Sequence, residues 1–225
     1  MSLFRLDASI RDEGSASRSL ADLVEAHWRE ATPDAPVTRR DIALDPLPSH
    51  VWAAAVTAGA TPQTRRTTPQ HSAVDLAGQL VDELAHADAY LFAVPLYNFG
   101  VSQHFKTYVD LVTTDPRMGP GVASVVSGKP AVLVTVQGGN YAPGTPKDGW
   151  DHATAWMRRI LEDVWGLDLD VVTREFTLVG VNPALDDFTD LAERIRTEAE
   201  DQARRSGEAL ARSARDLLHG GRGRR

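Results

Sequence analysis

The apolar positions along this chain change repeatedly from continuous or alternating runs to a spacing of three or four residues. Continuous and alternating runs are typical of strands, whereas the wider spacing is typical of amphipathic helices. The runs that predict strands lie at 3–8, 37–44, 89–94, 131–136 and 169–179. The stripes that predict helices lie within 19–30, 77–84, 101–112, 156–165 and 185–218, the last as one or two helices.

The alternation of strands with helices determines the expected fold class. A strand, a helix and a second, parallel strand form the repeating unit of α/β folds. The run at 131–136 is apolar throughout, as is typical of a central strand that is covered on both faces. We therefore expect an α/β fold with a doubly wound, five-stranded parallel sheet and helices on both of its faces.

Prolines interrupt the pattern between residues 45 and 70. Because proline restricts the backbone and removes an amide donor, we expect a long excursion there, with one short helix at 51–58. The chain has 225 residues and no break in composition, which predicts a single domain over 1–225. Its last residues combine arginines with glycines, so we expect 219–225 to be a flexible basic tail.

Composition and charge exclude several classes of function. The net charge of −7 argues against a general nucleic-acid binder, which needs a concentrated basic face. The absence of cysteine excludes thiol chemistry and iron–sulfur clusters, so redox chemistry would need an organic cofactor or a metal. No apolar stretch approaches the length of a membrane span or of a signal-peptide core. We therefore expect a cytoplasmic protein without a membrane partner.

Three loops that follow predicted strands contain the residues best suited to a ligand. Parallel strands deliver such loops to one edge of the sheet, where open α/β sheets bind their ligands. The first loop offers the hydroxyls of Ser9, Ser15 and Ser17 just before a helix, whose free amides and positive dipole end favour a phosphate. A serine-rich connection that merely caps a helix would contain the same residues, so both interpretations stay open for this loop alone.

The second loop has two aromatic residues around an amide, and it consists of Pro95, Leu96, Tyr97, Asn98 and Phe99. Its rings and amide can hold a flat heterocycle, although an aromatic corner packed in the core fits the same residues. The third loop begins with Gln137, Gly138 and Gly139, and paired glycines let backbone amides approach a ligand closely. The convergence of three such loops predicts a planar, phosphorylated cofactor.

In these loops the chain resembles the FMN-dependent NADH-azoreductases, flavodoxin-like NAD(P)H oxidoreductases that also reduce quinones. The resemblance extends from residue 3 to about residue 181. It implies FMN, with its phosphate at the first loop, its isoalloxazine ring and ribityl chain against the second loop, and its pyrimidine side at the third. The cofactor-binding residues that it implies are Ser9, Ser15, Ala16, Ser17, Pro95, Leu96, Tyr97, Asn98, Phe99, Gln137, Gly138 and Gly139.

The chain departs from this family at two positions. The family often has a polar residue where Ala16 stands, so only a backbone contact is expected there. It also often has Ser-Arg before the paired glycines, where this chain has Val136 and Gln137. The second departure is expected to change the flavin potential or the preference for a nicotinamide. The stretch 140–152, rich in glycine and proline, is expected to alter the active-site wall and so the substrate range.

The resemblance implies a two-step reaction in a homodimer. NADH or NADPH would reduce the flavin and leave, and a quinone or azo compound would then take two electrons, in a ping-pong sequence. Because the flavin carries the chemistry, no side chain is assigned as catalytic. Tyr97, Asn98 and Tyr141 are expected to position the flavin or to touch the substrate. The sequence leaves the physiological acceptor and the choice between NADH and NADPH open.

Two functions from other classes compete with this interpretation. A flavodoxin-type electron carrier or interaction module would hold FMN without oxidising a nicotinamide itself. A serine hydrolase built on Ser9 would need a Gly-x-Ser-x-Gly elbow and a triad, and the sequence offers neither. His104 and His152 lack the spacing of metal ligands, so no metal site is expected. The five tryptophans are expected mostly in the core.

Overall fold

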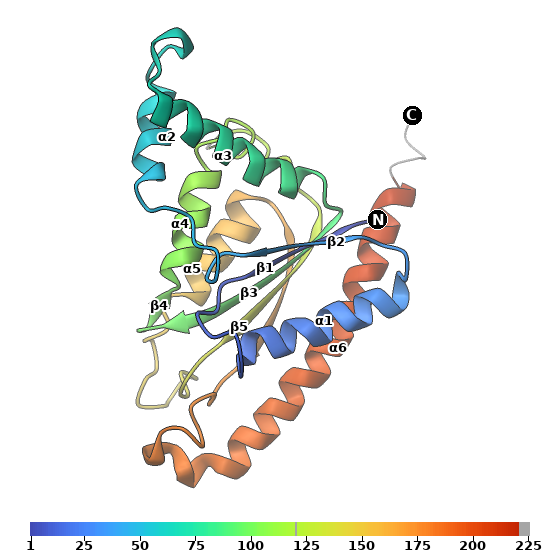
Figure 1. Ribbon diagram of the computed structural model, residues 1–225. Helices are drawn as coiled ribbons and strands as arrows, with labels where there is room; N and C mark the ends of the chain where they lie inside the picture. Colours follow the sequence, from blue (N-terminus) through green and yellow to red (C-terminus); the bar gives the residue numbers. More distant parts are fainter. Residues whose placement is uncertain (120, 221–225) are drawn as a thin grey trace.

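A twisted parallel sheet forms the centre of the protein in the computed structural model, which describes residues 1–119 and 121–220 (Figure 1). The order of its five parallel strands is β2 (Val37–Asp41), β1 (Leu3–Asp7), β3 (Ala89–Tyr97), β5 (Pro130–Val136) and β6 (Asp168–Arg174). A short strand, β4 (Gly100–Val101), pairs antiparallel with the end of β3. The predicted five-stranded, doubly wound parallel sheet is confirmed, and β4 is an addition to it.

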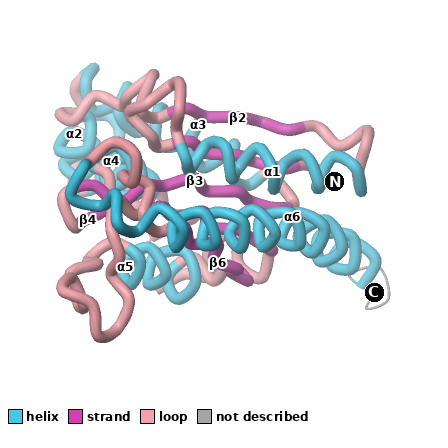
Figure 2. Tube along the Cα trace, turned by 90° about the horizontal axis from the view of Figure 1, so that it is seen from below, coloured by secondary structure: helices cyan, strands magenta, loops and turns pink. Residues whose placement is uncertain are grey.

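Helices cover both faces of the sheet, as the sequence predicts. One face is covered by α1 (Ala16–Ala31) and α6 (Thr189–Gly220), which run side by side (Figures 1 and 2). The other face is covered by α2 (Val51–Gly59), α3 (Thr68–Ala85), α4 (Gln103–Val112) and α5 (Thr154–Arg158). A π-helical turn (Arg159–Val164) continues α5, and short 3-10 turns lie at Gln63–Arg65 and Pro183–Phe188.

Several element boundaries differ from the sequence prediction: β3 continues beyond residue 94 to Tyr97, and α3 begins at Thr68, ahead of its apolar stripe at 77–84. Helix α1 starts at Ala16, before its apolar stripe, because the Ser15 hydroxyl caps it by accepting the amide of Arg18. Strand β2 ends at Asp41, whose carboxylate accepts the next free amides and turns the chain. Strand β6 ends at Arg174, and the residues after it form turns instead of a longer strand.

The register of the central strands places the three loops of interest at one edge. Leu3 of β1 pairs with Ala89 of β3, and Asp7 pairs with Ala93. Further along, Pro95 of β3 pairs with Val136 of β5. The chain therefore leaves β1, β3 and β5 at the same edge, the edge at which open α/β sheets bind ligands.

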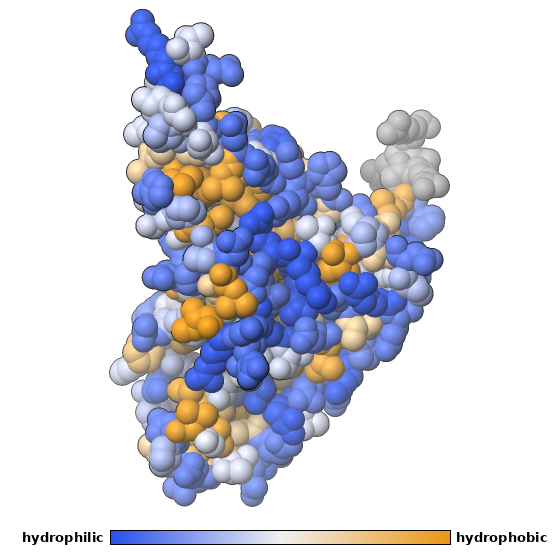
Figure 3. Space-filling view, in the orientation of Figure 1, coloured by the Kyte–Doolittle hydropathy of each residue, from blue (hydrophilic) through white to orange (hydrophobic). Residues whose placement is uncertain are grey.

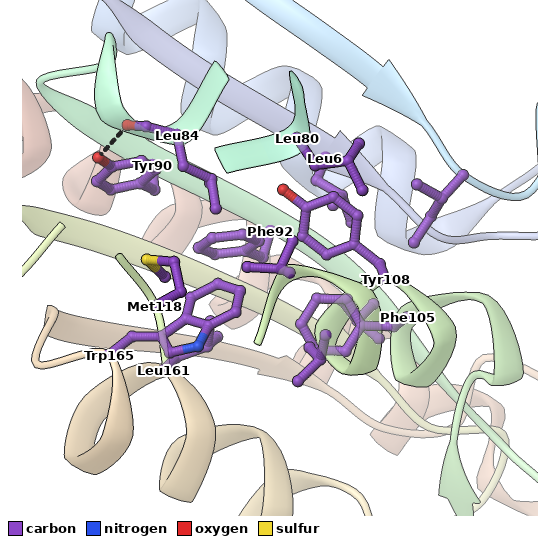
Figure 4. Close-up of a cluster of buried hydrophobic side chains, with 14 of the residues drawn as sticks. Leu6, Leu80, Leu84, Tyr90, Phe92, Phe105, Tyr108, Met118, Leu161 and Trp165 are labelled. Carbon is purple, nitrogen blue, oxygen red and sulfur yellow. Dashed lines mark hydrogen bonds between the residues drawn. The ribbon is translucent and has the colours of Figure 1, made fainter. Parts of the chain in front are cut away.

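Two hydrophobic cores lie on opposite faces of the sheet. The core under α3, α4 and α5 contains an aromatic cluster in which the ring of Phe92 meets Phe105 and Trp165 edge to face, at centroid distances of 6.2 and 6.3 Å (Figure 4). The buried Tyr90 donates its hydroxyl to the Leu84 carbonyl at 2.6 Å, which joins β3 to the end of α3. Full burial of each such side chain contributes about 1.5–3 kcal/mol to stability.

The second core joins α1 and α6 to the sheet and brings the two helices into very close contact. A Cβ atom added to Gly207 of α6 would lie 2.4 Å from the carbonyl oxygen of Val24 in α1. Only glycine permits this approach, because any side chain would push the helices apart. Helix α1 is therefore held against both the sheet and the neighbouring helix α6.

The surface and the chain end differ in part from expectation. Trp28 and Trp165 are buried, but Trp52 and Trp150 are nearly half exposed, so core packing is wrong for the latter two. Separate apolar patches interrupt the mainly hydrophilic face seen in Figure 3. Of the predicted tail 219–225, residues 219 and 220 end helix α6. Residues 221–225 lie outside the described residues.

Candidate functional site

A pocket of about 390 Å³ lies where the loops after β1, β3 and β5 meet, and we call it the sheet-edge pocket. Its volume is within the range of small-molecule sites. Ten of the twelve predicted cofactor-binding residues line it: Ser9, Ser15, Ala16, Ser17, Pro95, Leu96, Tyr97, Asn98, Phe99 and Gly138. Tyr141, predicted to position flavin or substrate, also lines it. The fold thus brings the three loops together.

Gln137 and Gly139, the other two predicted residues, do not line the pocket. Gln137 is buried, and its side-chain amide donates to Asp151 Oδ2 at 2.7 Å. Its carbonyl accepts hydrogen bonds from both the amide and the hydroxyl of Thr177 at 3.0 Å. The Gly139 carbonyl accepts the amide of Phe176 at 3.2 Å. Both residues brace the third loop from outside the pocket.

One end of the sheet-edge pocket is formed by the N-terminus of α1. Ser15 and Ser17 are almost completely buried, and their hydroxyl oxygens lie 3.3 Å apart. The amides in the first turn of a helix have no partner inside the helix, and the dipole adds a partial positive charge. Arg11, in the same loop, also lines the pocket. Hydroxyls, free amides and a cation together form a donor set suited to a phosphate.

A network of charged side chains holds the first loop in place. Arg18 donates to the carbonyls of Ser9 and Arg11, and it forms an ion pair with Asp41. Arg5 is buried and holds Asp7 with two hydrogen bonds of 2.9 and 3.1 Å. Burial alone would raise the pKa of Asp41, but the hydrogen bond and charge of Arg18, together with the amides of Ala43 and Leu44, outweigh this effect and lower the pKa. Asp41 therefore remains ionised and keeps Arg18 in place.

The second loop is a tight hairpin between β3 and β4. Asn98 and Phe99 occupy its tip with φ values of 47° and 66°, a left-handed conformation that is rare for a bulky aromatic residue. The Tyr97 hydroxyl accepts the amide of Ile10 at 3.0 Å and lies 3.5 Å from Ser9 Oγ. This hydroxyl joins the first loop to the second, so the two loops are held in a fixed relation.

An aromatic wall, formed by Phe99, Tyr141 and Trp150, borders the other end of the pocket. The ring of Phe99 lies edge to face with Trp150 at 5.2 Å and with Tyr141 at 6.3 Å between centroids. The His152 amide donates to the Phe99 carbonyl at 3.0 Å, which ties the wall to the hairpin. Burial, and secondarily the charge of Asp151, raises the pKa of the Tyr141 phenol, so it stays neutral. This end suits a flat aromatic ligand.

Six residues that line the pocket were not among the predicted site residues: Arg11, Gly14, Val136, Lys147, Thr177 and Leu178. The first two belong to the first loop and could have been included with its serines. The last two were assigned to a strand because of the apolar alternation around them. A Cβ on Gly138 would lie 2.6 Å from Leu178 Cδ1, so Leu178 packs directly over the third loop.

The charges around the sheet-edge pocket have one sign. Arg11 and Lys147 are its charged lining residues, and no carboxylate lines it among the residues that the structure describes. This is notable in a chain whose net charge is −7. Within the same residues, no group of histidine and carboxylate side chains could hold a metal ion. The pocket therefore selects for an anionic ligand.

Comparison with known proteins gives results for both sequence and fold. The family described as flavodoxin-like fold matches residues 1–199. An FMN-dependent NADH:quinone oxidoreductase of Frankia alni is 43% identical over 204 residues, which cover 90% of this chain and 96% of that protein. An azoreductase from Bacillus anthracis str. Sterne has a TM-score of 0.76 at 22% identity, over 93% of this chain and 100% of that one. An FMN-dependent NADH-azoreductase from Bacillus anthracis str. Ames Ancestor, in complex with FMN, has a TM-score of 0.71 at 16% identity. The match covers 92% of this chain and 99% of that one.

Proposed function

This chain belongs to the flavodoxin-like family of FMN-dependent NADH:quinone oxidoreductases, and we propose that its sheet-edge pocket holds the FMN. The protein is an FMN-dependent NAD(P)H oxidoreductase. One observation carries the assignment of the pocket: a phosphate-type donor set and an aromatic wall lie on different loops around a single cavity whose charged lining residues are both cationic. FMN has the same three properties, an anionic phosphate, a flat ring and a linker between them.

The residues of the pocket divide between the two ends of the ligand. We assign the phosphate to Ser9, Ser15, Ala16 and Ser17, where the α1 amides and the hydroxyls converge. We assign the ribityl chain and the ring to the second loop, Pro95 to Phe99, and to Gly138. Gln137 and Gly139 support the third loop through the bonds described above. The absence of a side chain at Gly138 leaves room that Leu178 fills from one side.

The protein contributes binding and orientation to the reaction. When bound, FMN supplies a ring that accepts hydride from NAD(P)H and passes two electrons to a quinone or azo acceptor. Tyr97 holds the first and second loops together, and Asn98 presents an amide at the exposed tip of the hairpin. The neutral Tyr141 phenol lies at the ring end, where it positions the ring or the acceptor. We assign no side chain as a proton donor.

We propose a ping-pong order for the two substrates. A pocket of about 390 Å³ offers room for FMN but no separate site for each of two further substrates, so NAD(P)H and the acceptor would take turns beside the aromatic wall. The stretch 140–152 provides Tyr141, Lys147 and Trp150 to this region. We therefore assign the selection of acceptors to this stretch.

We further propose that the protein works as a homodimer of single-domain subunits. The exposed fractions of Trp52 and Val56 on α2 are 46% and 51%, and those of Phe99 and Trp150 beside the pocket are 38% and 48%. A second copy that covers such side chains would also narrow the open side of the site. Light scattering that finds only monomers at working concentration would contradict this assignment. No helix in 1–119 or 121–220 is both long and apolar enough to cross a membrane.

A visible absorbance spectrum of the purified protein with FMN tests the proposed function. We expect the flavin bands to bleach on anaerobic addition of NADH or NADPH and to return on addition of a simple quinone. Flavin that binds but is not bleached by either nicotinamide would favour an electron carrier. Failure to bind added FMN would overturn the assignment of the pocket.

A further inference from the structure

The two cations of the sheet-edge pocket lie in different parts of its lining. Arg11 belongs to the first loop, next to the serines that receive the phosphate. Lys147 belongs to the stretch 140–152 and lies with the aromatic wall at the ring end. If the pocket holds FMN, the phosphate accounts for Arg11 but leaves Lys147 without a partner.

The position of Lys147 is defined by three contacts. Its Nζ atom lies 5.5 Å from the centre of the Tyr141 ring and 5.9 Å from the centre of the Phe99 ring. It also lies 3.4 Å from where a Cβ of Gly139 would be, so it is against the third loop. Aromatic faces attract a cation without neutralising it. The ammonium group is thus held at the ring end with its charge still available.

The nearby carboxylates are engaged elsewhere, which leaves this charge uncompensated. Asp148 accepts the amide of Gly144, and Asp151 accepts hydrogen bonds from Gln137 and Thr154. Glu175 accepts the amide of Tyr141 at 2.9 Å. Among the described residues no carboxylate lies within ion-pair distance of Lys147. The preferred partner of Lys147 is therefore an anion brought by the ligand.

The reaction itself creates an anion at this end of the pocket. The oxidised flavin ring is neutral, and a hydride from NAD(P)H brings it two electrons and one proton, so the reduced ring has one negative charge as NAD(P)⁺ leaves. We propose that Lys147 stabilises this negative charge and thereby raises the reduction potential of the bound flavin. This proposal rests on the proposed function, because it requires FMN in the sheet-edge pocket. It makes Lys147 a catalytic residue that acts by charge and not by proton transfer.

The test compares Lys147→Met with Lys147→Arg and with Arg11→Met as the matched control. Affinities for oxidised and reduced FMN are measured anaerobically, and the midpoint potential is measured against a dye of known potential. For Lys147→Met we expect the preference for reduced over oxidised FMN to fall by about tenfold, which corresponds to about 30 mV for a two-electron couple. Lys147→Arg should restore most of the potential because it keeps the charge.

Arg11→Met should weaken the binding of both redox states equally and leave the potential unchanged, because the phosphate charge does not change with reduction. Loss of the preference for FMN over riboflavin in the same variant would place Arg11 at the phosphate end.

An unchanged midpoint potential in Lys147→Met would overturn the proposal, even if the KM for an acidic acceptor or for NADPH rose. In that case Lys147 would serve the acceptor or the nicotinamide. If Lys147→Met bound oxidised FMN as the wild type does, the lowered potential could not come from misfolding. Wild-type protein that binds no FMN would instead overturn the proposed function, and this proposal with it.

Discussion

The Arg18 guanidinium donates from Nη2 to the Ser9 carbonyl at 2.9 Å. From Nε it also donates to the Arg11 carbonyl at 3.0 Å, so one side chain holds two carbonyls of the loop after β1. Arg18 itself does not line the sheet-edge pocket, and Asp41 holds it from the opposite side. The loop is therefore shaped by contacts made behind it, before any ligand arrives. Loss of Arg18 should therefore affect a flavin that has a phosphate more than one that lacks it.

Replacement of Arg18 by methionine should weaken FMN binding selectively. Each lost hydrogen bond to a charged group costs about 1.5–3 kcal/mol, so we expect a loss of about tenfold or more in FMN affinity. Riboflavin lacks the phosphate, and its affinity should change little. Flavin fluorescence titration of the apoprotein measures both. Arg39→Met removes an exposed arginine of the same network and serves as the control. Equal losses for the two flavins would contradict a role at the phosphate.

Gln137→Glu should destabilise the third loop by placing a carboxylate against Asp151. The Gln137 amide now donates to Asp151 Oδ2 at 2.7 Å, and the same carboxylate caps α5 by accepting the Ala153 and Thr154 amides. A buried, uncompensated charge costs about 3–5 kcal/mol. Urea denaturation should show this loss, and Asp151→Asn in the same background should recover part of it. If the double variant were no more stable than Gln137→Glu alone, the repulsion would not be its cause.

Gly138→Ala should weaken FMN binding because of Leu178. The added Cβ would lie 2.6 Å from Leu178 Cδ1, so either the side chain or the loop must move. Overpacking of this kind costs about 1–3 kcal/mol. A second substitution, Leu178→Ala, should restore much of the affinity. Gly59→Ala, whose Cβ would meet nothing within 4 Å, is the control. A Gly138→Ala variant that binds FMN as the wild type does would show that this loop adapts freely.

Acid should destabilise the protein through its network of arginines and carboxylates. Burial opposes ionisation of Glu25, but hydrogen bonds from Arg39 and Arg29 outweigh it and lower its pKa, and the pKa of Asp41 is lowered in the same way. A lowered folded-state pKa gives stability that is present above the unfolded value and lost as the pH falls through the folded value. We therefore expect the urea midpoint to fall from about pH 4 downward, since the unfolded values lie near 4.

Glu25→Gln should make this pH dependence shallower, because the buried Glu25 would no longer have to be protonated. Denaturation curves measured at several pH values for both proteins provide the comparison. A midpoint that stayed constant on acidification of the wild type would be incompatible with these pKa directions.

The sequence was most informative where one local rule decides the structure. Apolar runs such as 131–136 predicted the central strands, and strand ends predicted which loops meet at one edge. A loop was predicted at Pro95 to Phe99, but the continuation of β3 to Tyr97 and its hairpin with β4 were missed, because a proline in an apolar run usually marks the end of a strand. Lys147 and Leu178 reach the pocket only through the packing of distant segments. Their roles depend on tertiary contacts that have no local pattern.

The close contact between Gly207 of α6 and Val24 of α1 fixes one side of the site, whereas the opposite side tolerates changes of sequence. Helix α1 would present the phosphate end in the proposed assignment, and it cannot shift without disturbing α6 and the sheet. The acceptor side instead depends on the stretch 140–152, most of which lies at the surface outside regular helices and strands. Under the proposed assignment, substitutions within 142–150 that spare Lys147 should change the choice of acceptor while the affinity for FMN is retained.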